Sequence, residues 1–251
     1  MADVHPGLGI RFAARTDRGM VRRTNQDAAY AGSYLFAVAD GFGVAGGDRT
    51  ASAVAIKALE PLDTDHRGGN LLHRLREAMD GAQIAVREFI IADPARENTG
   101  TTLTAMLWDG AQFALGHVGD SRVYLLRGGA TTQITHDHTY VQSLVDEGRM
   151  TPDEAASHPQ RATLVRALHR DGTTEPDLHL REVRPGDRYL LCTDGLHAVV
   201  PEPRLSEVLV TARTPQEAAD QLLALADDGG APDNISSVIA DVLTCAAGGS
   251  G

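Results

Sequence analysis

Two short apolar runs in this chain end in an acid followed by glycine. Residues 35–41 read LFAVADG, and residues 189–195 read YLLCTDG. Uninterrupted runs of this length, rich in β-branched and aliphatic residues, are typical of buried strands, which we predict at residues 34–39 and 188–193. A third acid, Asp233, lies just before a further β-branched run, predicted as a strand over residues 235–242. Three rigid strands therefore carry a carboxylate at one end.

Helical spacing is found on either side of the middle of the chain. Residues 49–60 place apolar side chains on one helical face, and the segment that follows Asn70, a candidate N-cap, repeats them every three or four residues. Residues 136–167 are also predicted to be helical, with a capping box at residues 151–154. A similar capping pattern at residues 214–217 begins a further helix.

The middle of the chain has the pattern of strands. They are predicted at residues 10–14, and then at residues 102–107, 112–118, 121–126 and 131–134. The last four are joined by Asp109-Gly110, Gly119-Asp120 and Gly128-Gly129, which are tight-hairpin signals and predict an antiparallel meander. The order of elements predicts one α+β domain with antiparallel sheets packed between helix layers.

Composition and charge narrow the classes of function. Hydrophobic residues make up 42% of the 251 residues and charged residues 23%, which is a globular composition. The net charge of −11 argues against partners such as nucleic acid or an anionic membrane, since phosphate binding needs clustered cations. Cys192 and Cys245 do not suggest a disulfide framework. Without a long apolar stretch or a signal-peptide pattern, we expect a cytoplasmic protein.

The three acids at strand ends, Asp40, Asp194 and Asp233, are suited to a site for hard divalent cations. Strands hold the oxygen atoms in place, and small neighbours leave room for metal, water and substrate. Asp-Gly is also the strongest short hairpin signal. However, Asp40-Gly41 leads into a glycine-rich loop and Asp194-Gly195 leads into a helix, so neither is interpreted as a hairpin.

Six motifs extend this pattern over nearly the whole chain. They are RRTNQD at 22–27, VADGFG at 38–43, GTT at 100–102, GHVGDSR at 116–122, TDG at 193–195 and DN at 233–234. Their order and separations resemble the type 2C (PPM-type) metal-dependent protein serine/threonine phosphatases in their bacterial single-domain form. The resemblance implies a four-layer α-β-β-α sandwich of two antiparallel sheets flanked by helices. It also implies one phosphatase domain over residues 10–243, with a flap at about 136–167 and flexible tails at 1–9 and 244–251.

The resemblance also implies a centre for two Mn²⁺ or Mg²⁺ ions, between which the sequence does not distinguish, and for a third, weaker ion. Asp40 would bridge the two main ions. Asp194 and Asp233 would complete the shell of one, and the carbonyl group of Gly41 would bind the other. These three acids are the candidate catalytic metal ligands.

Three further residues receive roles from the same resemblance. Asp27 would hold a metal-bound water, and Asp120 would help to bind the third ion. Arg22 would be the catalytic and substrate-binding arginine, since its planar fork can hold two phosphate oxygens at once.

Three positions depart from the pattern of the family. Gln26 stands where the family often has Glu, and an uncharged amide predicts weaker binding of metal or water on that side. Phe42 replaces a histidine that is a proposed general acid in eukaryotic members, so water or another group would protonate the leaving oxygen. Val44, within residues 43–48, stands where glycine would permit a positive φ, which predicts an altered loop.

The expected function is hydrolysis of phosphoserine and phosphothreonine in proteins by a metal-bound water, without a covalent intermediate. The expected partners are phosphorylated proteins, among them Ser/Thr kinases and their substrates. One alternative is a phosphatase-like regulator that binds a partner without turning it over, which Gln26 and Val44 motivate. Another is a hydrolase of small phosphates, although no G-x-x-x-x-G-K-[ST] loop is present.

Other polar residues near these motifs are assigned structural roles. The tract His136-Asp137-His138 could bind a transition metal, but one short tract rarely forms a metal site alone. It is therefore interpreted as a solvated loop at the start of the flap. His117, between strand residues, is expected to be a packed histidine. Arg161 and Arg166 could contact a phosphopeptide substrate, but the simpler expectation places them on a helix surface.

Overall fold

A computed structural model describes residues 7–44, 49–67, 69–171 and 174–245 of the chain. The first strand, β1, begins at Leu8 and the last strand, β13, ends at Thr244, so both run further than predicted. Most of the two predicted tails, residues 1–6 and 246–251, lies outside the described residues. The same is true of residues 45–48 in the glycine-rich loop.

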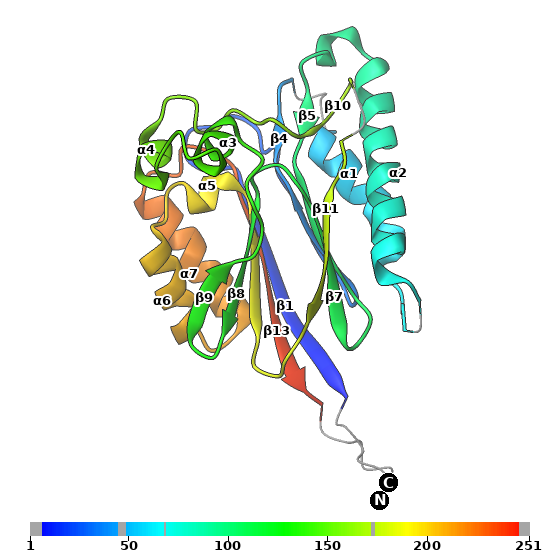
Figure 1. Cartoon of the computed structure of the whole chain (residues 1–251), viewed down its shortest axis with the longest axis vertical. Helices are drawn as coiled ribbons and strands as arrows, with labels where there is room; N and C mark the ends of the chain where they lie inside the picture. Colours follow the sequence, from blue (N-terminus) through cyan, green and yellow to red (C-terminus); the bar gives the residue numbers. More distant parts are fainter. Residues whose placement is uncertain (1–6, 45–48, 68, 172–173, 246–251) are drawn as a thin grey trace, which may run out of the picture.

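Two five-stranded antiparallel sheets face each other in the middle of the molecule (Figure 1). The first sheet has the order β1 (Leu8–Asp17), β13 (Ile235–Thr244), β12 (Arg188–Cys192), β8 (Arg122–Arg127) and β9 (Ala130–Gln133). The second has the order β11 (Asp177–Glu182), β7 (Gln112–Val118), β6 (Leu103–Trp108), β3 (Leu35–Ala39) and β2 (Ala28–Ala31). A small third sheet joins β10 (Leu168–His169), β5 (Gly100–Thr101) and β4 (Gly41–Phe42).

Helices cover the outer face of each large sheet, which confirms the predicted four-layer arrangement (Figure 1). The second sheet is covered by α1 (Ala51–Leu59) and α2 (Leu71–Ile91). The first is covered by α5 (Asp194–His197), α6 (Glu202–Thr211) and α7 (Pro215–Asp228). Short 3-10 turns follow α1 (Glu60–Leu62) and α2 (Pro94–Arg96). Among the helices in the described ranges, none has both the length and the apolar character needed to cross a membrane.

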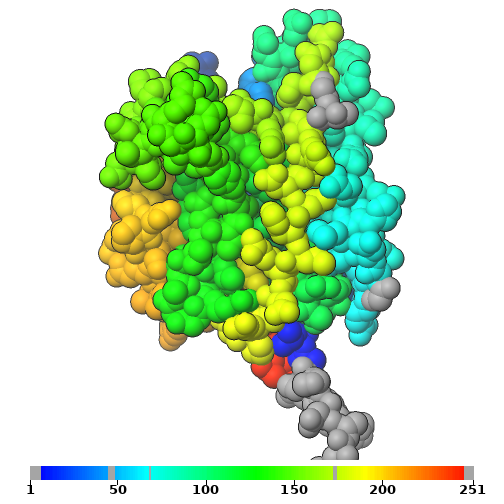
Figure 2. All heavy atoms as spheres, viewed as in Figure 1, coloured from blue at the N-terminus to red at the C-terminus, as the bar shows by residue number. Residues whose placement is uncertain are grey.

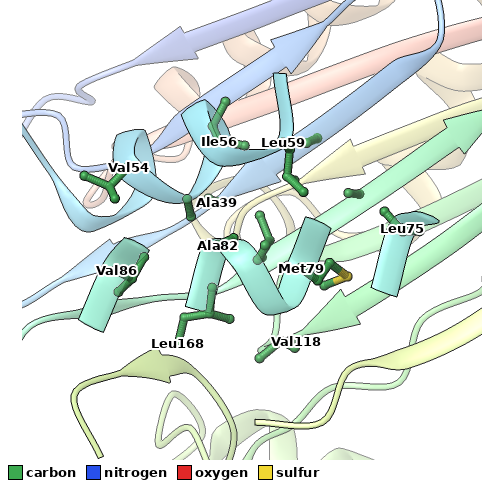
Figure 3. Packing of buried hydrophobic residues seen from close by; sticks show 14 of the residues in the cluster. Ala39, Val54, Ile56, Leu59, Leu75, Met79, Ala82, Val86, Val118 and Leu168 are labelled. Atoms are coloured by element: carbon green, nitrogen blue, oxygen red, sulfur yellow. The ribbon is translucent and has the colours of Figure 1, made fainter. Parts of the chain in front are cut away.

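Strand β3 shows why its sequence is apolar at every position. Leu35, Ala37 and Ala39 pack against the helix layer of α1 and α2. Phe36 and Val38 point the other way, into the core between the two sheets. Because side chains alternate between the faces of a strand, a strand buried on both sides has no polar position. Figure 3 shows the helix side of this core around Ala39.

Aromatic side chains concentrate in the core between the sheets, although they are only 4% of the sequence. Phe36 and Phe113 of the second sheet meet edge to face, with ring centroids 5.9 Å apart. Phe113 also meets Tyr189 of the first sheet at 5.1 Å. Each such pair contributes about 0.5–1.5 kcal/mol beyond its buried area. These rings therefore hold the two sheets in a fixed relation.

The predicted helix caps are confirmed. The Asn70 side chain accepts a hydrogen bond from the His73 backbone N–H at 3.0 Å and begins α2. Thr151 and Glu154 form the complete capping box of α4 (Pro152–Ser157). The Thr214 side chain caps α7 by accepting a hydrogen bond from the Glu217 N–H. These short polar signals define helix starts because they satisfy backbone donors that have no partner inside the helix.

The prediction of helix throughout residues 136–167, named here the flap, is wrong. The flap contains two short helices, α3 (Tyr140–Asp146) and α4, joined and followed by turns. Gly148 takes a φ of +68°, which ends α3, and Thr151 is extended before Pro152. In Figure 2 the flap forms a lobe at the upper left, above α6 and α7.

The predicted four-strand meander is also wrong at one joint. The hairpins at Asp109-Gly110 and Gly128-Gly129 are confirmed, since they join β6 to β7 and β8 to β9. At Gly119-Asp120, however, the chain crosses from the second sheet to the first. The free edge of β7 is taken by β11, a strand that was not predicted because its residues are mostly exposed or half-buried. Asp120 is therefore placed between the two sheets.

Candidate active site

Antiparallel pairing brings the predicted acids to one end of the sandwich. Asp194 follows β12 and Asp233 precedes β13, and these two strands pair antiparallel, so the end of one lies beside the start of the other. Asp40 follows β3 and Asp27 precedes β2, which are paired in the same way. Asp120 lies where β7 ends and β8 begins. All five acids are thus at the end shown uppermost in Figure 1.

A cleft of about 850 Å³ opens at this end. The predicted residues that line it are Arg22, Asp40, Gly41, Asp120, Asp194 and Asp233. Asp27 is the only member of the predicted set that is not part of the lining; it is buried beside the cleft, with 9% of its surface exposed. Another part of the wall is formed by the end of the flap, residues 162 and 164–167, together with residues 169–171.

The glycine after each acid permits a close approach of backbone segments. A Cβ atom at Gly195 would overlap the carbonyl group of Asn234. A Cβ atom at Gly41 would overlap the carbonyl group of Gln26 in the same way. The glycines of the two Asp-Gly pairs therefore allow two backbone segments to pack closely. As a result, Asp194 can lie near residue 233 and Asp40 near residue 27.

Asp27 is fixed by a hydrogen bond from below the cleft. The hydroxyl group of Thr193 donates to Asp27 Oδ2 at 2.7 Å. Burial raises the pKa of Asp27 to about 7, although the Thr193 bond lowers it, and the charges of Asp194 and Asp233 raise it further. One carboxylate oxygen is thus occupied, which leaves the other for interactions with the cleft.

The backbone of Asp40 is held by Thr102. The Asp40 N–H donates to Thr102 Oγ1 at 2.9 Å, and the Thr102 N–H donates to the Asp40 carbonyl oxygen at 2.9 Å. Burial, with the charges of Asp27 and Asp194, raises the pKa of the Asp40 carboxyl well above its usual range. The threonine motif was recognised in the sequence without a role. Thr102, from this motif, fixes the backbone position of Asp40 among the other acids of the cleft.

Asp120 is the third acid with a perturbed pKa. Burial raises the pKa of Asp120 to about 8, and the charges of Asp194 and Asp137 act in the same direction. Its carbonyl oxygen accepts a hydrogen bond from His197 Nε2 at 2.9 Å. His197 had no predicted role, because nothing in the sequence indicates that α5 turns back toward residue 120.

The donor set fits hard divalent cations. All the candidate side-chain ligands are carboxylates, and Asp194 Oδ1 is buried without a hydrogen-bond partner. Burial, and then the charges of neighbouring acids, raise the pKa values of Asp40 and Asp120, and bound cations would relieve the repulsion between these acids.

Asp233, a cleft residue, is paired with an arginine in this structure. Within the described residues, no three acidic, histidine or cysteine side chains surround one ion position as they stand. Oδ2 of Asp233 is 2.6 Å from Nη2 of Arg22. A cation shared by Asp40, Asp194 and Asp233 would therefore compete with Arg22 for the Asp233 carboxylate.

The loop that carries Arg22 is held by Asn234, a residue whose role the sequence did not reveal. The Asn234 side-chain amide donates to the carbonyl oxygens of Arg18 at 2.8 Å and Thr24 at 3.0 Å. Its Oδ1 accepts from the Gln26 N–H at 2.8 Å. An amide can make all three bonds because it both donates and accepts. The position of Arg22 therefore depends on the residue next to Asp233.

The departures from the family pattern are accommodated locally. Gln26 Nε2 donates to the carbonyl oxygen of Gly43 at 3.2 Å. Gly43 takes the positive φ, at +91°, whereas Val44 does not. The Val44 N–H donates to Thr99 Oγ1 at 3.1 Å. The described part of this loop therefore tolerates Val44 without backbone strain. The side chain of Phe42 lies on the cleft wall.

The interpretation of His136-Asp137-His138 as a solvated loop is wrong for two of its three residues. Asp137 and His138 are buried, and Asp137 binds Arg122 at 2.7 Å. His136 is exposed and pairs with Asp146 at 2.8 Å. The start of the flap is thus anchored in the protein through Asp137 and His138.

The predictions for His117 and two arginines have different outcomes. His117 is confirmed as a packed histidine, with 2% of its surface exposed. Arg161 is exposed but lies in a turn, and Arg166 lies in a bend, so placing them on a helix surface was wrong. Arg166 lies on the cleft wall and pairs with Asp177 at 2.9 Å.

Comparison with known proteins gives a consistent set of similarities. Residues 21–228 match the family model described as protein phosphatase 2C. The chain is 49% identical over 236 residues to the serine/threonine protein phosphatase PstP of Mycobacterium tuberculosis. That match covers 94% of this chain and 46% of the relative, so the chain spans about half the length of PstP.

Two further similarities extend over nearly the whole length of this chain and of the protein compared with it. The serine/threonine phosphatase stp of Listeria monocytogenes (strain EGD-e) is 32% identical over 238 residues, covering 90% of this chain and 94% of the relative. A crystal structure of the PstP catalytic domain in complex with two manganese ions is similar with a TM-score of 0.86 and 47% identity. It covers 94% of this chain and 99% of that one.

Proposed function

The chain belongs to the protein phosphatase 2C family, and on that premise we propose that it is a metal-dependent phosphatase acting on phosphoserine and phosphothreonine in proteins. The observation that carries the proposal is the convergence of Asp40, Asp194 and Asp233 in one cleft with Arg22. Acids that can hold cations, with the guanidinium fork of Arg22 beside them, match the needs of a phosphoryl group, because the cations and the arginine would neutralise its oxygen atoms.

The proposed cofactors are two Mn²⁺ or Mg²⁺ ions, with a third, weaker one. Asp40, Asp194, Asp233 and the carbonyl group of Gly41 would hold the first two, and Asp120 would help to hold the third. When bound, such ions lower the pKa of a coordinated water and neutralise phosphoryl oxygens. The two manganese ions in the PstP catalytic domain, whose fold this chain shares, support the proposal.

The other residues of the cleft supply binding and orientation. Arg22, with 56% of its side chain exposed, can turn from Asp233 to hold two oxygens of the phosphoryl group. Asp27, buried beside the cleft and held by Thr193, would accept a hydrogen bond from a water through its remaining oxygen and so orient that water.

The proposed reaction has no covalent phospho-enzyme. Cys192, which lies next to Thr193, is fully buried, and burial raises the pKa of its thiol to about 12. A thiol that stays protonated is a poor nucleophile. Direct attack by an oriented water on phosphorus is therefore the route that these residues support.

The test is hydrolysis of a phosphothreonine peptide by the purified protein in the presence of Mn²⁺. We expect activity that disappears when the metal is chelated and returns when Mn²⁺ is restored. Asp40→Asn should reduce the rate by at least 100-fold, about 3 kcal/mol. Asp80→Asn, which removes an exposed charge on α2, should leave the rate unchanged. Full activity of the Asp40→Asn variant would contradict the proposal.

Two competing functions predict other results in the same assay. A regulator that binds without turnover would show peptide binding, little Mn²⁺ binding in a calorimetric titration, and no release of phosphate. A hydrolase of small phosphates would prefer nucleotides to the phosphothreonine peptide. We further propose that Ser/Thr kinases and their phosphorylated substrates are the partners, and that the protein acts in the cytoplasm.

A further inference from the structure

His138 joins the start of the flap to the turn that carries Asp120. Its backbone N–H donates to the carbonyl oxygen of Gly119 at 2.7 Å. Its own carbonyl oxygen accepts from the N–H of Val165 at 2.9 Å, where the flap returns to the cleft. One residue thus contacts the Gly119-Asp120 turn on one side and the cleft wall on the other.

The imidazole ring of His138 reinforces the same link. Its Nδ1 accepts a hydrogen bond from the Gly119 N–H at 3.1 Å, and its Nε2 lies 3.1 Å from Asp177 Oδ2. Since a backbone N–H can only donate, Nδ1 must be unprotonated. The ring proton is then on Nε2 and is donated to Asp177. Only 5% of the side chain is exposed, so water cannot easily replace either bond.

A second histidine supports the ring from below. The rings of His117 and His138 stack with centroids 4.8 Å apart and planes inclined by 32°. His117 Nε2 donates to the carbonyl oxygen of His136 at 3.0 Å, and its Nδ1 accepts from the Thr104 hydroxyl at 2.9 Å. The platform beneath His138 is therefore built from β6 and β7 of the second sheet.

The outer end of the ring is held by the cleft wall. Arg166 Nη1 donates to Asp177 Oδ1 at 2.9 Å, so the acid that accepts from His138 is itself bound to the flap. Arg166 and Val165 line the cleft, as does Asp120. Both walls of the cleft are therefore connected through the His138 ring.

We propose that His138 is a positioning residue whose imidazole fixes the Gly119-Asp120 turn relative to the Val165–Arg166 wall of the cleft. The Nδ1 bond to Gly119 is the decisive contact, because Gly119 has a φ of +112° and is followed directly by Asp120. This inference deepens the proposed phosphatase function and rests on it only for the kinetic part of its test.

Substitutions of His138 can remove its ring contact with Gly119 or its ring contact with Asp177 separately. In His138→Asn the amide oxygen takes the place of Nδ1, so the bond to Gly119 is kept and the bond to Asp177 is lost. In His138→Gln the amide reaches the place of Nε2, so the bond to Asp177 is kept and that to Gly119 is lost. His138→Ala loses both. The two amide variants differ by one methylene group and are matched controls for each other.

The first readout is hydrogen exchange of the Gly119 amide in protein stripped of metal with a chelator. We expect exchange about tenfold faster in His138→Gln and His138→Ala, the effect of one lost hydrogen bond, and near the wild-type rate in His138→Asn. Equal protection in the Asn and Gln variants would overturn the proposal.

The second readout is hydrolysis of a phosphothreonine peptide with Mn²⁺. We expect kcat/KM to fall about tenfold in His138→Gln and to be largely restored in His138→Asn. Thermal unfolding midpoints should be similar for these two variants. Kinetics that follow the unfolding midpoints, and not the Gly119 bond, would show a purely structural role and refute the proposal. If the wild-type protein has no activity, the proposed function fails, while the exchange pattern still decides the role of His138.

Discussion

Nη2 of Arg22 lies 2.6 Å from Oδ2 of Asp233, so the proposed phosphate-binding arginine and a proposed metal ligand neutralise each other. The hydrogen bond and charge of Asp233 raise the pKa of Arg22, which keeps the guanidinium fully charged. Each partner has a second proposed occupant: a phosphoryl group for Arg22 and a cation for Asp233. Binding of the cation would therefore release the arginine for substrate.

Replacement of Arg22 separates these two roles. Arg22→Ala should lower kcat/KM for a phosphothreonine peptide by about 10–100-fold, the effect of losing charge-assisted hydrogen bonds to phosphate. It should also tighten Mn²⁺ binding, since a competing cation is removed from Asp233. Enzyme kinetics and calorimetric titration measure the two effects. Arg22→Lys should restore little activity, because an ammonium group cannot form the two parallel bonds. Weaker Mn²⁺ binding by Arg22→Ala would contradict the competition.

Stability without metal should depend on pH through the buried acids. The pKa of Asp27 is raised to about 7 and that of Asp120 to about 8, from 3.8. The folded state therefore holds protons that the unfolded chain has released. The resulting stabilisation is complete below about pH 4 and is lost as the pH rises toward 8. In the presence of a chelator, the free energy of unfolding should fall by about 1 kcal/mol between pH 7 and pH 8.5, and the unfolding temperature should fall with it.

This pH range avoids the opposing effect of histidines. Burial lowers the pKa of His117 to about 4, so its contribution to stability increases up to about pH 6.5 and is then constant. Asp120→Asn should flatten the decline, and Mn²⁺ should abolish it by compensating the charge. A rise in unfolding temperature over this range, or an unchanged decline in Asp120→Asn, would count against the assignment.

Asn234 should affect activity more than its effect on stability explains. Asn234→Ala removes three hydrogen bonds to the loop that carries Arg22 and is expected to destabilise the protein by about 1–3 kcal/mol. We expect the peptide hydrolysis rate to fall at least tenfold at temperatures where the variant is folded. Asn70→Ala is the control. Loss of the α2 cap also costs about 1 kcal/mol, but Asn70 is not among the residues that line the cleft. Its activity should be unchanged.

The two kinds of glycine in this protein should respond oppositely to alanine. Gly195→Ala would drive a methyl group into the Asn234 carbonyl group, so we expect severe destabilisation, above about 3 kcal/mol, or failure to fold. Gly81→Ala, at an open position in α2, should increase stability by about 0.5–1 kcal/mol. Chemical denaturation measures both. A stable and active Gly195→Ala variant would show that the close approach is not required.

The elements that the sequence predicted well are those whose pattern is local. Asn70 and Thr151 mark helix starts by their own hydrogen bonds. Strand β3 is recognisable because both of its faces are buried. The acids at strand ends follow directly from those strands, and the structure brings Asp40, Asp194 and Asp233 to one cleft as the pattern indicated.

The elements that were missed depend on contacts between distant segments. The Gly119-Asp120 joint has the local features of a hairpin, and it is excluded by the pairing of β7 with β11 and of β8 with β12 and β9. The flap carries helical spacing, yet it is divided at Gly148 and anchored through His138. The role of Asn234 is equally hidden, because its partners are more than 200 residues away.

The last strand has a practical consequence for attaching other molecules to this protein. Strand β13 starts beside Asp233, and its ten residues run to the opposite end of the sandwich, where Thr244 pairs with Leu8 (Figure 1). At about 3.3 Å per residue, that distance is roughly 30 Å. A dye, tag or surface linker joined near Leu8 or Thr244 would start far from the entrance of the cleft. Immobilised protein should therefore still admit large substrates.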